Sequence, residues 1–67
     1  MTEHYRTSLA ILRRKQVEVE TGLARSTIYD RMKDGTFPAA IKIGVKAVGW
    51  RVGDIEKFLA NPAGFRA

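Results

Sequence analysis

The side chains best suited to a chemical task gather in residues 25–34, and the chemistry that they offer is recognition. Arginine donates to phosphate and to guanine, hydroxyls donate or accept, and aspartate accepts from the amino group of cytosine. The candidate contact residues of this stretch are Arg25, Ser26, Thr27, Tyr29, Asp30 and Lys33. Such a set is typical of the recognition helix of a helix-turn-helix. The competing interpretation is a solvated surface helix without a partner.

A second set of cations lies in residues 41–51. It comprises Lys42, Lys46 and Arg51, with no acid in the whole stretch. A small ribbon that carries cations beside a recognition helix is suited to DNA phosphates and resembles the wing of a winged helix. The competing interpretation is an ordinary surface hairpin with scattered lysines, and the missing acids favour the wing.

A third cationic run, Arg13-Arg14-Lys15, stands where an earlier helix is expected to begin. These side chains have the reach to contact phosphate. We favour an ordinary charged helix face, because the helix macrodipole disfavours cations at a helix start. Phosphate contact is the alternative for this run.

The sequence lacks the residue combinations that a catalytic or metal-binding site would need. The sequence has no cysteine and a single histidine, His4, which lies in a polar segment without a second ligand nearby. Disulfides and cysteine-ligated zinc are excluded, and no Ser/His/Asp or Cys/His set exists. None of the glycines forms a phosphate-cradling pattern. We therefore expect no enzyme activity, no cofactor, no metal and no small-molecule ligand.

Composition and charge point to a small module with a polyanionic partner. The chain has 67 residues, with 12 Lys+Arg against 7 Asp+Glu and a formal net charge of +5, which allows one domain with a small core. Nucleic acid is the first candidate partner, and acidic protein surfaces and anionic lipid compete with it. No apolar run approaches the roughly 20 residues of a membrane span, and no signal-peptide pattern is present. We expect a soluble, cytoplasmic protein.

Two short helices joined by a glycine turn must position the first set. Ile28 and Met32 lie four residues apart and give helix 25–34 one face to bury, and Gly35 can end it with a positive φ. The pattern also predicts an earlier helix over residues 13–20, with Val17 inward and Leu23 in the angle between the two helices. On helix 25–34 the outer face is expected to carry Arg31 and Asp34 as well.

After Gly35 the apolar period changes to two, which predicts a hairpin over residues 41–51. We expect Ile41 and Ile43 on its inner face, opposite Val48 and Trp50. Lys42 and Arg51 should then point outward, with Lys46 near the tip.

The ends of the chain frame this domain. A helix over residues 53–60 should bury Ile55, Phe58 and Leu59 and stop at Asn61-Pro62. We divide the chain into an N-terminal arm (1–10), a DNA-binding domain (11–60) and a tail (61–67) that docks on the domain or on a partner. The apolar run 9–12 is expected to pack under the domain. The predicted fold class is mainly α with a small β-hairpin, a winged helix-turn-helix.

The order and spacing of several pieces resemble the AlpA family of prophage regulators. The pieces are LRRKQV (12–17), TGLARSTIY (21–29), GTFP (35–38), IKIG (41–44), AVGW (47–50) and DIEKFL (54–59). The resemblance implies a bacterial winged helix-turn-helix protein, related in fold to MerR-type domains and phage excisionases. Two departures stand out: members often have Ser where Ala24 stands, and often Arg where Asp30 stands.

The resemblance implies a sequence-specific double-stranded DNA-binding protein that regulates transcription, with helix 25–34 in the major groove and hairpin 41–51 as wing. An excisionase that bends attachment-site DNA together with an integrase is one alternative. A protein-interaction module with a basic face is another, and its partner would be an integrase or RNA polymerase. A domain of this size reads few base pairs, so we expect several cooperative copies on repeated sites.

Overall fold

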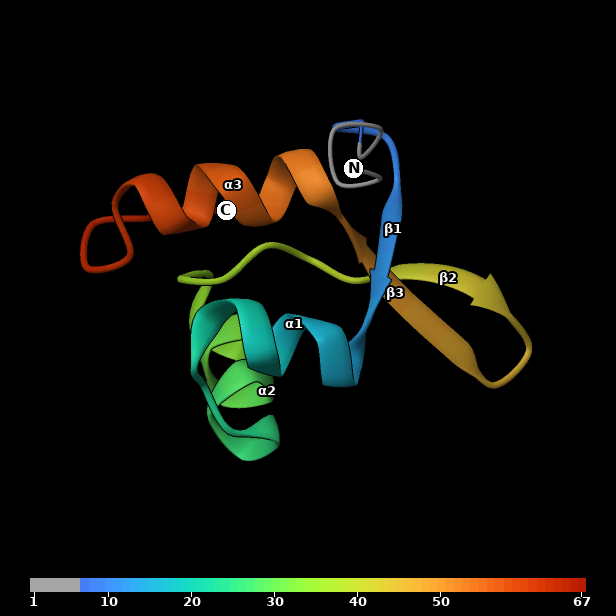
Figure 1. Ribbon diagram of the computed structural model, residues 1–67. Coiled ribbons are helices and arrows are strands. Elements are labelled where there is room, and N and C mark those ends of the chain that lie inside the picture. Colours follow the sequence, from blue (N-terminus) through green and yellow to red (C-terminus); the bar gives the residue numbers. More distant parts are fainter. Residues whose placement is uncertain (1–6) are drawn as a thin grey trace.

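The computed structural model describes residues 7–67, which form three helices and one three-stranded antiparallel sheet (Figure 1). In chain order the elements are β1 (Ile11–Arg13), α1 (Arg14–Thr21), α2 (Arg25–Asp34), β2 (Ile41–Gly44), β3 (Ala47–Arg51) and α3 (Val52–Ala60). The β2–β3 hairpin extends away from the helices. No helix within residues 7–67 has the length and apolar character needed to cross a membrane.

Glycines end both helices of the predicted pair, as their freedom to adopt positive φ requires. Gly22 follows α1 with φ 73°, and Gly35 follows α2 with φ 75°. The predicted bounds of α2 are confirmed, whereas α1 begins and ends one residue later than predicted. The reason is Arg13, which is the last residue of β1 and has extended backbone angles.

The sheet contains a strand that the sequence pattern did not predict. Its order is β1-β3-β2, and β1 pairs with β3 so that Leu12 stands opposite Trp50. The apolar run before α1 therefore forms an edge strand. The predicted fold, mainly helices with a hairpin, therefore lacked one strand. A strand of three residues is too short to show an alternating pattern in the sequence.

The two faces of the hairpin differ from the prediction. Lys42 pairs with Val48 and Ile41 pairs with Gly49, and residues directly opposite each other share a face. Val48 and Trp50 do face the core, but Lys42 shares their face, and Ile41 lies on the other one. A side chain at Gly49 would clash with those of Ile11 and Ile43, which close over it on that outer face.

The core joins one side of the sheet to all three helices. Its buried members are Leu12, Val17, Ile28, Phe37, Trp50, Val52, Ile55 and Phe58. The indole N–H of Trp50 donates to the Pro38 carbonyl at 2.9 Å. In α3, Ile55 and Phe58 are buried as predicted, whereas Leu59 is 39% exposed, so the prediction for Leu59 was wrong.

Both ends of the described chain are bonded to the domain. The amides of Val52 and Gly53 donate to the carbonyls of Ala10 and Ser8, so these two residues belong to the fold and not to an arm. Residues 1–6, which contain His4 and most of the predicted arm, lie outside the described residues. At the other end Phe65 packs edge-on against Phe58 at 5.7 Å, which makes the domain the docking place of the tail.

Candidate nucleic-acid interface

Three elements meet around a surface hollow of about 460 Å³, which we call the basic hollow. Its lining residues are Arg13, Arg14, Lys15, Arg25, Tyr29, Lys46 and Val48. The first three come from the junction of β1 and α1, the next two from α2, and the last two from the hairpin. Five of the seven are cationic and none is acidic, so the hollow concentrates positive potential.

Helix α2 presents the predicted polar row to solvent. Ile28 is fully buried and Met32 packs against the core, which turns the opposite side outward. The exposed side chains of α2 are Arg25, Ser26, Thr27, Asp30, Lys33 and Asp34. The helix thus separates a buried anchor from a polar surface, as a helix that inserts into a groove must.

Arg25 is supported by an aromatic pair beneath it. Its guanidinium carbon lies 5.9 Å from the centroid of the Tyr29 ring, within the range of a cation–π contact. Tyr29 in turn packs edge-on against Trp50, with ring centroids 6.4 Å apart. Half-buried Tyr29 therefore links the position of Arg25 to the core.

The hairpin brings two of its three predicted cations to the helix side of the sheet. Lys46 stands in the exposed turn between β2 and β3 and lines the basic hollow. Lys42 is exposed on the face of Val48, which also lines it.

Arg51 is not brought to this site. It ends β3 at the end away from the turn, where it is half-buried and donates from Nη1 to the Leu9 carbonyl at 2.8 Å. Arg51 lies on the outer face of the sheet, as predicted, but Lys42 lies on the opposite face, so the two cations do not share one surface.

Arg31 also departs from the exposed position that we predicted for it. Its guanidinium lies 4.9 Å from the Phe58 ring centroid and donates to the carbonyls of Thr36 and Pro62 at 3.1 and 2.6 Å. These contacts hold the C-terminal half of α2 to α3 and the tail. Arg31 is thus a residue of the fold, turned away from the exposed row.

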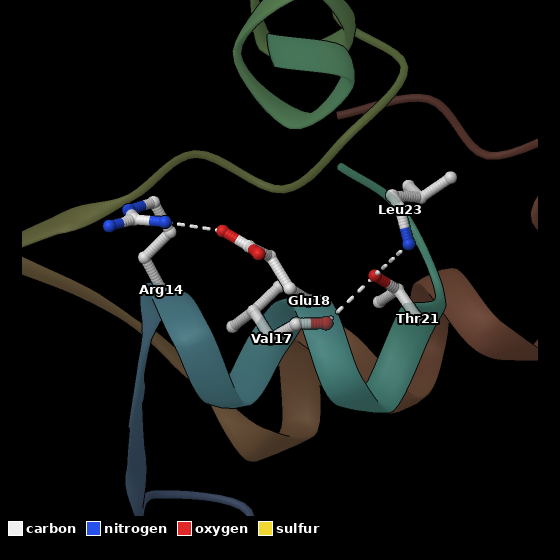
Figure 2. A network of polar contacts seen from close by, with 5 residues as sticks. All are labelled: Arg14, Val17, Glu18, Thr21 and Leu23. Atoms are coloured by element: carbon white, nitrogen blue, oxygen red, sulfur yellow. Dashed lines mark hydrogen bonds and ion pairs between the residues drawn. The ribbon is translucent and has the colours of Figure 1, made fainter. Parts of the chain in front are cut away.

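The start of α1 supplies the cations that our sequence interpretation set aside. Arg14 is half-buried and forms an ion pair with Glu18 one turn along α1 (Figure 2). Arg13 and Lys15 are exposed. The pairing of β1 with β3 places this segment beside the hairpin, and no local signal in the sequence indicated that neighbourhood.

The turn that orients α1 against α2 is closed by one hydroxyl (Figure 2). Thr21 Oγ1 donates to the Val17 carbonyl at 2.7 Å and accepts from the Leu23 amide at 3.3 Å. Leu23 packs against the core as predicted. No cluster of metal-ligating side chains occurs within residues 7–67.

Comparison with known proteins gives a family and two relatives. The family described as prophage CP4-57 regulatory protein (AlpA) matches residues 10–62. The chain is 41% identical over 62 residues to the DNA-binding transcriptional activator AlpA of Escherichia coli K12, covering 84% of this chain and 89% of the relative. It is 35% identical over 55 residues to an uncharacterized protein of Enterobacteria phage P4, covering 82% and 62%. No solved structure matches the chain significantly.

Proposed function

Because this chain belongs to the AlpA family of prophage regulatory proteins, we propose that it is a sequence-specific double-stranded DNA-binding protein that regulates transcription. One relative is a DNA-binding transcriptional activator by name. The observation that carries the proposal for this chain is the exposed row on α2, which continues into the basic hollow and on to the hairpin. We expect the protein to work in the bacterial cytoplasm, where the DNA is.

In this proposal α1 and α2 form a helix-turn-helix, and the β2–β3 hairpin is the wing. Helix α2 enters the major groove, with Arg25, Ser26 and Thr27 toward the base edges. Asp30 accepts from a cytosine amino group or repels the backbone. Lys33 and Lys42 meet phosphates from either side. Lys46 at the tip reaches the adjacent backbone or minor groove.

Recognition in this arrangement depends on how firmly Arg25 is held. A bidentate contact from arginine to guanine discriminates among bases by about 1–3 kcal/mol when its geometry is fixed. The cation–π contact of Arg25 with Tyr29, and the edge-on contact of Tyr29 with Trp50, limit the orientations of the guanidinium before DNA arrives. Contacts with an integrase or RNA polymerase, and cooperative copies on repeated sites, stay predictions of the sequence.

Two substitutions test the assignment of base and phosphate contacts. Arg25→Ala should cost about 1–3 kcal/mol on a preferred duplex and less on a scrambled one, because it removes base discrimination. Lys46→Ala should weaken both duplexes by a similar factor and lower the slope of log affinity against log salt by roughly one. Fluorescence anisotropy across a salt series measures both effects, with a preferred site taken from selection on random duplexes.

Circular dichroism serves as the control that both variants are folded. If neither variant loses affinity for duplex DNA, the DNA-facing surface has been assigned to the wrong side of the domain. The basic face would then be a protein-interaction surface.

A further inference from the structure

The first turn of α1 forms one wall of the basic hollow, although none of its residues belongs to the proposed recognition helix or wing. Arg13, Arg14 and Lys15 all line the hollow together with Lys46. Arg13 ends β1, and β1 is hydrogen-bonded along β3, so the backbone of this wall is fixed to the strand that leads from the hairpin.

The three cations of this wall are not equivalent. Arg14 is half-buried, and the carboxylate of Glu18 neutralises it within α1. Arg13 and Lys15 are exposed, and within residues 7–67 neither side chain forms an ion pair. Two uncompensated charges therefore remain at the rim of the hollow.

Like charges line the hollow, and no acidic residue is part of its lining. Arg13 and Lys15 stand in it together with Arg25 and Lys46, and its remaining lining is provided by Arg14, Tyr29 and Val48. Like charges brought together by folding repel one another, so a bound anion is stabilised there. The helix macrodipole adds to the repulsion of cations at the start of α1.

The position of the hollow indicates which kind of anion binds there. It lies between the first turn of α2 and the turn of the hairpin, the two elements proposed to contact neighbouring parts of one duplex. The backbone that separates those parts must pass the hollow. Its phosphodiesters are single, closely spaced negative charges. Exposed arginine and lysine side chains therefore match a DNA backbone better than they match an acidic protein surface of fixed shape.

We propose that Arg13 and Lys15, together with Lys46, hold a backbone phosphate of duplex DNA in the basic hollow. The first turn of α1 is then a third DNA-contacting element, between the recognition helix and the wing. This inference rests on the proposed function. In this inference Arg13 and Lys15 contribute to the affinity for DNA and fix the register of the protein on the duplex. Discrimination among bases remains the role of α2.

The test compares the double variant Arg13→Gln/Lys15→Gln with Lys57→Gln as a charge-loss control. Lys57 is exposed on α3, beside Asp54 and Arg66 and away from the basic hollow. Binding to the preferred and scrambled duplexes is measured by anisotropy across a salt series. For the double variant the salt slope should fall by roughly 0.9 for each phosphate that is no longer neutralised, and affinity should fall by a similar factor for both duplexes. Lys57→Gln should leave the slope close to that of the unmodified protein.

Two further variants keep the test decisive. Lys15→Gln alone changes one exposed side chain and should lower the slope by less than the double variant does. The exchange Arg13→Lys/Lys15→Arg keeps both charges and should retain the original slope.

A double variant that matches Lys57→Gln, in a protein that still prefers its duplex, overturns this inference and leaves the proposed function standing. Failure of the unmodified protein to bind any duplex contradicts the proposed function itself. Circular dichroism of each variant confirms that the fold is retained.

Discussion

At the scale of single residues, Trp50 connects the sheet, the loop after α2 and α2 itself. It is fully buried, stands opposite Leu12 in the sheet, and contacts Tyr29 and Phe37 edge-on. Its N–H is bonded to the Pro38 carbonyl. One side chain thus fixes both the register of β3 and the support beneath Arg25.

Removing this side chain should strongly destabilise the domain. Trp50→Ala leaves a large cavity and should cost about 3–5 kcal/mol, much of the stability available to a domain of 67 residues. Trp50→Phe keeps most of the volume but leaves the Pro38 carbonyl unpaired, so it should cost less. Urea titration followed by circular dichroism gives both values. An unchanged melting temperature for Trp50→Ala would contradict the buried position.

At the scale of elements, α2 lacks a side-chain cap at its start. The N-cap residue is Ala24, with φ −75° and ψ 160° and no side-chain hydrogen bond. These are the extended angles that a capping serine adopts. Helix α2 therefore begins without the side-chain hydrogen bond that this backbone geometry would allow.

Ala24→Ser should therefore stabilise the domain. A serine cap is worth about 0.5–2 kcal/mol relative to alanine, which corresponds to a rise of roughly 4–8 °C in Tm for each kcal/mol in a domain of this size. Ala39→Ser, at an exposed position in the loop before β2, is the matched control and should change little. Thermal melts of the two variants decide the matter, and a fall in Tm for Ala24→Ser would show that the hydroxyl cannot reach the helix amides.

At the scale of the whole molecule, the C-terminal tail braces the far end of α2. Phe65 packs on Phe58, the Ala67 amide donates to the Gly35 carbonyl at 2.7 Å, and Arg31 donates to the Pro62 carbonyl. Residues 63–67 lie beyond the family match, which ends at residue 62. The tail thus contacts both α3 and the C-terminal end of α2.

Phe65→Ala measures the contribution of this brace. Full burial of a phenylalanine is worth about 1.5–3 kcal/mol, and Phe65 is only half-buried, so we expect a loss of about 1–2 kcal/mol. Arg66→Ala, at the exposed neighbouring position, should stay within about 0.5 kcal/mol. Denaturant unfolding compares them. Equal stability of the two variants would mean that the tail does not brace the domain.

The sequence by itself determined the elements whose signals are local. The spacing of Ile28 and Met32 and the stop at Gly35 predicted the bounds of α2, and the change of apolar period predicted a hairpin over residues 41–51. Exposure of Arg25 and Lys46 followed from the same patterns. Each of these depends on residues a few positions apart, which a helix turn or a hairpin turn brings together.

Only the tertiary structure decided what depends on distant partners. Strand β1 exists through its pairing with β3, and the irregular register between Lys42 and Gly44 places Ile41 and Lys42 on faces opposite to those predicted. A shift of one residue exchanges the faces of a strand, and local alternation does not fix which face meets the core. The same reason applies to the contacts of Arg31 and Arg51, which join segments that are distant in the sequence. It also applies to the basic hollow, where Arg13 and Lys15 lie near Lys46 only once the core has formed.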